Sequence, residues 1–246
     1  MIYCILSDIH SNYSALEAVF KDAEKNYNIN EVICLGDIVG YGPFPNECVD
    51  FIKNKCSVIC AGNHDFAALN IIDISEFNDY AKTAIQWTAE KLTDNNKDFI
   101  SNLKPYSYYR GVELVHASLS DNISEYIINV WSAVSNFKLQ KSFLCFNGHT
   151  HTPVVFYQLT EHKDARAYRF EDGPEYYVLE ENKYIINAGS VGQPRDHDPR
   201  ASYLIYDTEK NMILNRRVEY CIEDTQNAMR NAGLPFFLIE RLKEGK

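Results

Sequence analysis

The sequence predicts an α/β fold, and three features carry that prediction. The first third of the 246 residues alternates apolar runs of strand length at 2–6, 31–35 and 57–61 with amphipathic segments. This β-α-β-α-β order predicts a parallel sheet with right-handed crossovers. The segment from about 64 to 104 is helical in composition, and the chain after Pro105 is rich in strand patterns. Short turns between those later strands predict hairpins and a second sheet, antiparallel or mixed.

The elements of the first third follow from the spacing of their apolar residues. The continuous runs IYCIL and EVICL are typical of strands that are buried on both faces. Between them, Leu16, Val19 and Phe20 recur at helical intervals, with Ser14 as the expected N-cap. NECVDFIKN predicts a second helix capped by Asn46, because the two prolines before it forbid an earlier start.

The rest of the chain is read from the same periodicities. In the middle segment we expect a buried helical stripe of Tyr80, Ala84, Trp87 and Leu92. A series of strands is expected after Pro105, and these are SYYRGVELVHA, FLCFNGH, VVFYQL, AYRF, EYYVL, KYIINAG, ASYLIYD and MILNRRVEY. A helix pair is expected to follow them, around 222–231 and 235–243. Neither a repeat nor a linker interrupts the pattern, which predicts one domain over residues 1–246.

The charge and composition limit the classes of partner. The formal net charge of −10 and the pI near 5.2 argue against a nucleic-acid groove and against binding to an anionic membrane surface. No apolar run approaches the roughly 20 residues of a membrane helix, and MIYCILSDIH reads as a first strand rather than a signal peptide. The seven cysteines form no CxxC pair, so we expect reduced thiols and a cytoplasmic protein.

Polar residues with ligand chemistry follow five of the predicted strands. In α/β sheets, ligands bind outside the carboxyl ends of the strands. Each motif alone has a purely structural explanation, such as a capped turn or a packing histidine. Their joint order and spacing instead favour one convergent metal site, made of Asp8 and His10, Asp37, Asn63 with His64 and Asp65, His116, and His149 with His151.

This set of motifs resembles the calcineurin-like metallophosphoesterase superfamily, in particular its small bacterial and archaeal phosphodiesterase-like branch. The resemblance spans residues 7 to about 192 and rests on Asp8-x-His10, Gly36-Asp37, Gly62-Asn63-His64-Asp65, His116 and Gly148-His149-x-His151. It implies a four-layer α/β/β/α sandwich of two mixed sheets flanked by helices. It also implies a two-metal site between the sheets.

The resemblance further implies a role for each ligand. Asp8, His10 and His151 would hold one ion, and Asp37 would bridge the two ions. Asn63, His116 and His149 would hold the other. Oxygen and imidazole ligands without thiolate suit manganese, iron, nickel or zinc, and we favour manganese. A hydroxide bound by both metals would attack the phosphorus.

Other residues near these motifs are further candidates, and among them the resemblance implies the role of His64. His64 would act on the phosphate as a proton donor or as a charge stabiliser, and Asp65 would either orient it or serve packing. Arg195, Tyr41 or the backbone N–H groups of GSVGQ (189–193) are the candidates for binding the substrate's phosphate, although Arg195 would equally suit ion pairs with the neighbouring aspartates. His197 is expected to be a loop residue and His162 to be solvated.

One departure from the superfamily pattern bears on substrate choice. Protein phosphatases carry an Asp-Arg pair after the bridging aspartate's turn, where this chain has Gly40 and Tyr41. We therefore expect a phosphodiesterase or nucleotide-pyrophosphatase-type hydrolase acting on a small soluble ester, for example a dinucleoside polyphosphate. A phosphomonoesterase and a non-catalytic metal-binding scaffold are the alternatives. The oligomeric state, a homo-oligomer included, stays open.

Overall fold

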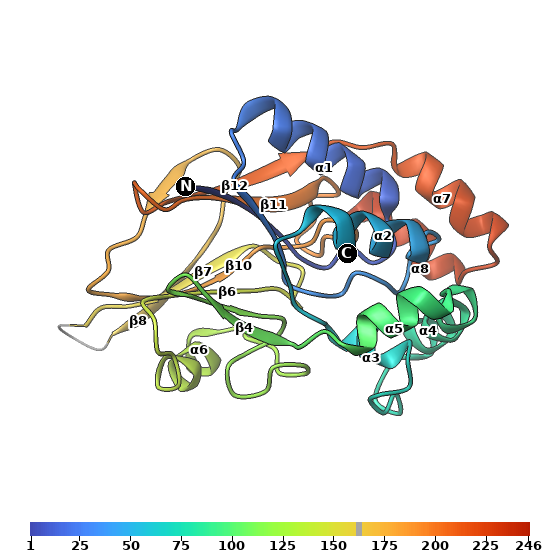
Figure 1. The fold of residues 1–246 in the computed structure, drawn as a ribbon, viewed down its shortest axis with the longest axis horizontal. Helices are drawn as coiled ribbons and strands as arrows, with labels where there is room; N and C mark the ends of the chain where they lie inside the picture. The colour runs from blue at the N-terminus through green and yellow to red at the C-terminus, as the bar shows by residue number, and fades with distance from the viewer. Residues whose placement is uncertain (161–163) are drawn as a thin grey trace.

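Two six-stranded mixed sheets pack face to face in the computed structural model, which describes residues 1–160 and 164–246 (Figure 1). The predicted solvation of His162 lies outside the described residues. Helices cover the outer face of each sheet, so that the order of layers is α/β/β/α, as expected. The apolar side chains between the sheets include Ile5, Ile33, Leu114 and Phe146.

The first sheet has the order β3-β2-β1-β11-β12-β9. Its parallel half contains the three strands predicted in the first third, and its other half is antiparallel. The strands are β1 (Ile2–Leu6), β2 (Glu31–Cys34), β3 (Val58–Ile59), β9 (Glu175–Tyr177), β11 (Ala201–Asp207) and β12 (Met212–Val218).

The second sheet has the order β4-β5-β6-β10-β7-β8. The strands β5, β6 and β10 are parallel, and antiparallel partners flank them. Its strands are β4 (Tyr106–Tyr109), β5 (Val112–Val115), β6 (Leu144–Asn147), β7 (Val154–Gln158), β8 (Ala165–Arg169) and β10 (Lys183–Asn187).

The predicted second, mixed sheet is present, but three of the later strands, β9, β11 and β12, join the first sheet instead. All seven residues of β11 are buried, so this strand needs cover on both faces. Pairing with β1 in the middle of the first sheet provides that cover, with helix α1 (Tyr13–Asn26) on one side and the second sheet on the other.

The helices complete the outer layers. On the first sheet, α1 and α2 (Pro45–Lys55) pack on the outer face, and α7 (Ile222–Asn231) packs against α1. On the second sheet, α6 (Val130–Phe137) is the covering helix. Helix α6 is not among the elements predicted from the sequence, because its eight residues lie within a region of strand-like composition. The other helices are α3 (Asn63–Ala67), α4 (Asp79–Lys91), α5 (Asp94–Ser101) and α8 (Phe236–Glu244).

Both predicted helix caps are wrong. The amide of Ala15 donates to the side chain of Asn12 at 3.3 Å, so Asn12 and not Ser14 caps α1. Helix α2 begins at Pro45, which has no N–H to satisfy, and Asn46 instead bonds to the main chain at the α4–α5 connection.

The predicted stripe of α4 is also only partly right. Its buried face contains Ala81, Ala84, Ile85 and Thr88, whereas Tyr80 is exposed and stacks on Phe237.

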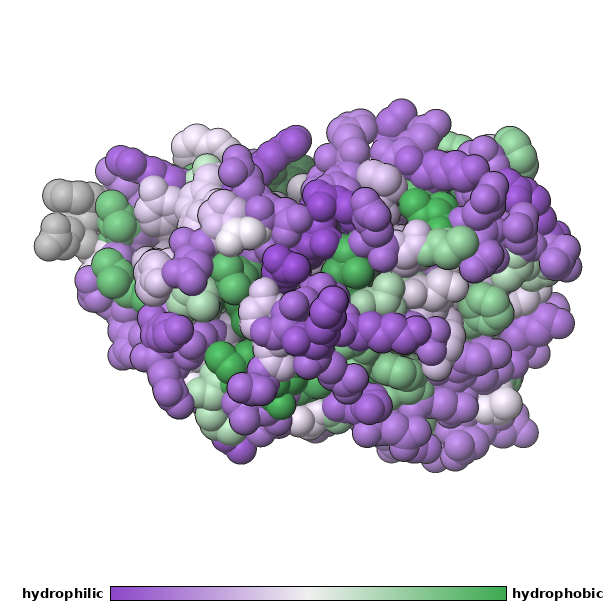
Figure 2. All heavy atoms as spheres, turned by 90° about the horizontal axis from the view of Figure 1, so that it is seen from above, coloured by the Kyte–Doolittle hydropathy of each residue, from purple (hydrophilic) through white to green (hydrophobic). Residues whose placement is uncertain are grey.

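Two further features of the described residues concern the surface and the cysteines. The face of the molecule in Figure 2 is largely hydrophilic, with hydrophobic side chains in scattered groups. Within the described ranges, no helix has the length and apolar character needed to cross a membrane. All seven cysteines are free, and five of them are buried.

Candidate metal centre

Strained main chain presents five of the predicted ligands. Asp8 and His10 follow β1, Asp37 follows β2, and His149 and His151 follow β6. Their φ angles are 53°, 49°, 53°, 67° and 59°, in the left-handed region that side chains with a Cβ seldom adopt. Each such position costs about 1–3 kcal/mol, and strain of this kind concentrates at functional sites.

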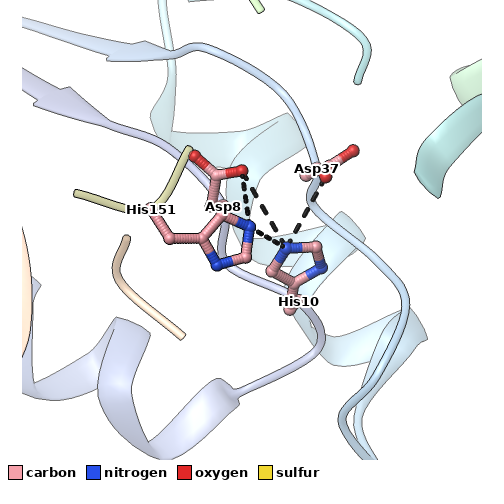
Figure 3. Close-up of side chains that lie close together, drawn as sticks. All are labelled: Asp8, His10, Asp37 and His151. Carbon is pink, nitrogen blue, oxygen red and sulfur yellow. Dashed lines mark hydrogen bonds and ion pairs between the residues drawn. The ribbon is translucent and has the colours of Figure 1, made fainter. Parts of the chain in front are cut away.

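The first of two side-chain clusters contains Asp8, His10, Asp37 and His151, all buried and all converging on one point (Figure 3). The Nε2 atoms of His10 and His151 lie 3.0 Å apart. The Nε2 of His151 lies 3.2 Å from Oδ1 of Asp8, and the Nε2 of His10 lies 3.6 Å from Oδ2 of Asp37.

The second cluster shares Asp37 with the first and adds His116 and His149. The Nε2 of His116 lies 3.6 Å from Oδ2 of Asp37 and 3.0 Å from Oδ1 of Asn63. Asp37 is therefore the one residue that faces both groups, which is the position expected of a bridging carboxylate. The structure thus brings together all seven predicted ligands.

Backbone carbonyls set the proton positions on the four imidazoles. A carbonyl only accepts, so the ring nitrogen that contacts it carries the proton and the other nitrogen presents a lone pair to the cluster. Metal-binding histidines are typically held in this way. The contacts are His10 Nδ1 to Val39 O (3.2 Å), His116 Nδ1 to Leu35 O (3.0 Å), His151 Nδ1 to Gln193 O (2.6 Å) and His149 Nε2 to Ser124 O (3.2 Å).

This arrangement fits a bound cation. In these tautomers the Nε2 atoms of His10 and His151 point two lone pairs at each other across 3.0 Å, an unfavourable contact that a metal ion between them relieves. Two adjacent nitrogens bound to one ion at about 2.1 Å also lie roughly 3 Å apart. The full donor set of carboxylates, imidazoles and one amide suits divalent transition metals.

Burial shifts the pKa values of the ligands so that the uncharged form of each is favoured. Burial lowers the pKa of His149 to about 3 and that of His151 to about 4, so both rings are neutral ligands at neutral pH. Burial, with the nearby charges of Asp8 and Asp65, raises the pKa of Asp37 well above its usual value. A positive ion between these carboxylates would reverse that effect.

His64 lies beside the metal ligands without joining either cluster. Its ring is packed between those of Tyr41 and Phe77, with centroid distances of 4.4 and 5.4 Å, and its main-chain N–H donates to Oδ1 of Asp37 at 2.8 Å. A Cβ on Gly40 would lie 2.6 Å from the Nδ1 of His64, so only glycine admits the ring there. Burial and the charge of Arg195 lower the pKa of His64 well below its usual value.

Asp65 does not hold the His64 ring. Its carboxylate accepts from the amides of Gly62 at 2.9 Å and Val39 at 3.0 Å, while the buried Nδ1 of His64 has no partner within the described part of the chain. Asp65 was expected either to orient His64 or to serve packing, and these main-chain contacts support the packing role. Asp65 joins the loop after β2 to the start of α3, and so positions the main chain that carries His64.

The two predicted substrate residues are in contact with each other. The Nη2 of Arg195 lies 3.4 Å from the hydroxyl of Tyr41 and 2.9 Å from Oε1 of Gln193. The alternative ion pairs of Arg195 do not form, because Arg217 pairs with Asp196 and Arg200 pairs with Asp198. His197 is an exposed loop residue, as expected.

A cleft of about 500 Å³ opens onto the second cluster. Asn63, His64 and His149 form part of its lining, and Phe77 and Tyr126 contribute aromatic surface. Tyr126 was not among the site residues predicted from the sequence, although its ring centroid lies 3.9 Å from that of His149. No motif contains Tyr126, and only the fold of the loop before α6 brings it to the site.

The fold and the site define a phosphoesterase of the two-sheet α/β type with a cluster suited to divalent metal ions. The family profile described as calcineurin-like phosphoesterase matches residues 1–189, and the chain belongs to that family. The family acts as hydrolases on phosphoester bonds.

Several proteins are similar over nearly the whole chain. An uncharacterized protein of Methanocaldococcus jannaschii is 36% identical over 98% of this chain and 97% of its own length. The crystal structure of a metallophosphoesterase from Sphaerobacter thermophilus is 40% identical with a TM-score of 0.89, over 100% of this chain and 99% of that chain. A hypothetical protein from Pyrococcus horikoshii shares the fold, with 20% identity and a TM-score of 0.81 over 100% and 98% of the two chains. The neighbours are small bacterial and archaeal proteins, as the motifs indicated.

Proposed function

We propose that this protein is a phosphodiesterase or nucleotide-pyrophosphatase-type hydrolase that uses two divalent metal ions. The observation that carries the proposal is the pair of buried clusters that share Asp37 beside an open cleft. In this proposal Asp8, His10 and His151 hold one ion, whereas Asn63, His116 and His149 hold the other, and Asp37 bridges them.

When bound, the metal ions would lower the pKa of a water molecule, bind the phosphoryl oxygens and stabilise an in-line displacement. Two divalent ions bring four positive charges, and Asp8 and Asp37 offset two of them. The remaining ligands are neutral, so the centre attracts a phosphate even in a chain with a net charge of −10. Screening confines the repulsion from distant surface charges to about 8 Å at physiological salt. A ligand set without thiolate suits manganese, iron, nickel or zinc, and manganese is the ion we prefer for the assays.

The neighbouring side chains would position the ester and assist its departure. His64 lines the cleft, where its ring would act on a phosphoryl or leaving oxygen. Arg195 and Tyr41 would contact the phosphoryl group or its substituent, since Tyr41 lies beside His64 and His10 and Arg195 contacts the Tyr41 hydroxyl.

The cleft favours a diester over a monoester. Phe77 and Tyr126 present aromatic surface next to His64 and His149, and a monoester would leave much of the 500 Å³ unused. A base or another planar group stacked there would add binding energy. Dinucleoside polyphosphates are therefore our preferred substrates. The buried free cysteines support a cytoplasmic location, and residues 1–246 would act as one domain because both sheets contribute ligands.

A paired assay tests this function. The purified protein should hydrolyse bis(p-nitrophenyl) phosphate faster than p-nitrophenyl phosphate when manganese is present, and chelation should abolish both activities until manganese is restored. Faster release from the monoester would make the protein a phosphomonoesterase. Absence of turnover by a protein that binds two ions would favour the scaffold alternative.

A further inference from the structure

A second cavity lies directly beside the cleft of the candidate metal centre. It has a volume of about 450 Å³, and Tyr126 lines both it and the cleft. Thr150 and Thr152, which alternate in the chain with His149 and His151, also line it. Tyr126 therefore stands between two spaces that both adjoin the loop with these histidines. We call the second space the side pocket, and its lining includes Tyr126, Thr150, Phe156, Ala167 and Arg169.

The floor of the side pocket is the outer face of the second sheet. Val154 and Phe156 of β7 lie opposite Arg169 and Ala167 of β8, and side chains directly opposite each other share one face of a sheet. Val154 follows His151 by three residues and Phe156 follows it by five. The floor therefore begins with a cation at the end nearer the metal ligands and continues as an apolar surface, where the small side chain of Ala167 leaves room.

The opposite wall is the segment before α6, and contacts within the chain hold it in place. Glu125 accepts a hydrogen bond from the hydroxyl of Ser118 and another, at 3.1 Å, from Nδ2 of Asn136. Ile127 is buried in the apolar cluster between α6 and the second sheet. Its neighbour Ile128 is 70% exposed and lines the side pocket. A ligand in the pocket would cover this apolar surface, which favours binding.

Arg169 gives the side pocket its charge. Its side chain forms no ion pair and no hydrogen bond with any residue in the ranges that the structure describes. Arg200 and Arg217, in contrast, pair with aspartates. A guanidinium group binds phosphate oxygens well, so a guanidinium next to an apolar pocket suits a ligand that joins a phosphate to a planar, largely apolar group.

We propose that the side pocket binds the second nucleoside of a dinucleoside polyphosphate, with the base over Phe156 and Ala167 beside Tyr126 and the phosphate chain passing Arg169. This inference rests on the proposed function and narrows its substrates to esters that carry a planar group at each end. The cleft would receive one end and the side pocket the other. Stacking on aromatic rings tolerates different bases, so the pocket selects a class of substrate rather than one nucleotide.

A substitution that fills the pocket tests this proposal. Ala167→Phe adds a ring on an exposed position of the edge strand β8. With manganese, it should raise KM for diadenosine tetraphosphate about 10-fold, because the base loses its place. KM for methyl p-nitrophenyl phosphate, a diester with a single planar group, should not change. Ala167→Ser keeps the pocket open and is the matched control. Ile128→Ser removes apolar wall without adding bulk, and should raise the first KM about 3-fold.

A binding measurement separates this inference from the proposed function. In calorimetry on chelator-treated protein, the wild type should bind diadenosine tetraphosphate more tightly than ATP, which has one base, and Ala167→Phe should lose that difference. Equal binding of the two ligands by the wild type, with an unchanged KM in both variants, would overturn the side-pocket proposal. A wild type that shows the binding difference but cleaves neither substrate would overturn the phosphodiesterase function and leave this inference standing.

A second copy of the chain is the other occupant that the experiment must exclude. Size-exclusion chromatography should give the same oligomeric state for the wild type, Ala167→Phe and Ile128→Ser. A dimer that dissociates on either substitution would show that a partner chain covers the side pocket, and the proposal would fall.

Discussion

The two metal-facing clusters differ in charge and in access. The first has two carboxylates, Asp8 and Asp37, and is closed off beneath the loops after β1 and β6. The second shares Asp37 but adds only neutral donors, and two of these, Asn63 and His149, line the cleft. A closed site with more negative charge holds its ion more strongly, whereas an open one offers its ion to the substrate. We therefore expect one tightly held ion and one exchangeable ion.

The largest effect should come from the residue that both clusters share. Asp37→Asn removes the bridging charge, and both ions should be weakened together. If metal ions contribute several kcal/mol of transition-state stabilisation, activity should fall about 10⁴-fold. Metal analysis and kcat/KM with bis(p-nitrophenyl) phosphate measure the two effects. Asp50→Asn, an exposed change on α2, is the control. Normal turnover and two bound ions in Asp37→Asn would show that Asp37 is not the bridge.

The next comparison sets one cluster against the other. Asp8→Asn should lose the tightly held ion, with a fall in activity of about 10³-fold, because a charged ligand is removed from a closed site. Asn63→Ala should retain that ion after dialysis and recover much of its activity in excess manganese. Metal content after dialysis and activity across a manganese titration measure the difference. Equal metal loss in the two variants would contradict the division into a tight and an exchangeable site.

A smaller effect is expected from the residue that lies between the clusters and the substrate. His64→Ala should keep both ions and lose about 10²–10³-fold in turnover, within the range for general acid catalysis. A nucleoside leaving group should suffer more than p-nitrophenolate, which needs little protonation. His197→Ala, in an exposed loop, is the matched control. Equal slowing of both substrates would assign His64 to charge stabilisation, and loss of an ion would make it a ligand.

The smallest effect should concern stability rather than chemistry. Asp65→Ala leaves the amides of Gly62 and Val39 without their acceptor, which should lower the free energy of unfolding by about 2 kcal/mol. Thermal unfolding measures this change, and the bound metal should be retained in the folded protein. A large loss of turnover without any loss of stability would return Asp65 to a direct role in orienting His64.

The sequence by itself determined most of the elements and the set of candidate metal ligands. Strand runs such as 2–6 and 31–35 are recognisable because continuous apolar stretches reflect burial on both faces. The ligands were recognisable because each directly follows such a strand, and the carboxyl ends of parallel strands meet at one edge. Both kinds of signal are local in the chain.

Only the tertiary structure decided which distant segments meet. The sheet that β11 joins and the contact of the Asp65 carboxylate with the amide of Val39 depend on pairing between distant segments that have no local preference for one another. Tyr126 belongs to none of the motifs, and its ring centroid lies 3.9 Å from that of His149. Its place at the site follows from the tertiary fold, because long-range contacts and not local spacing position a side chain in three dimensions.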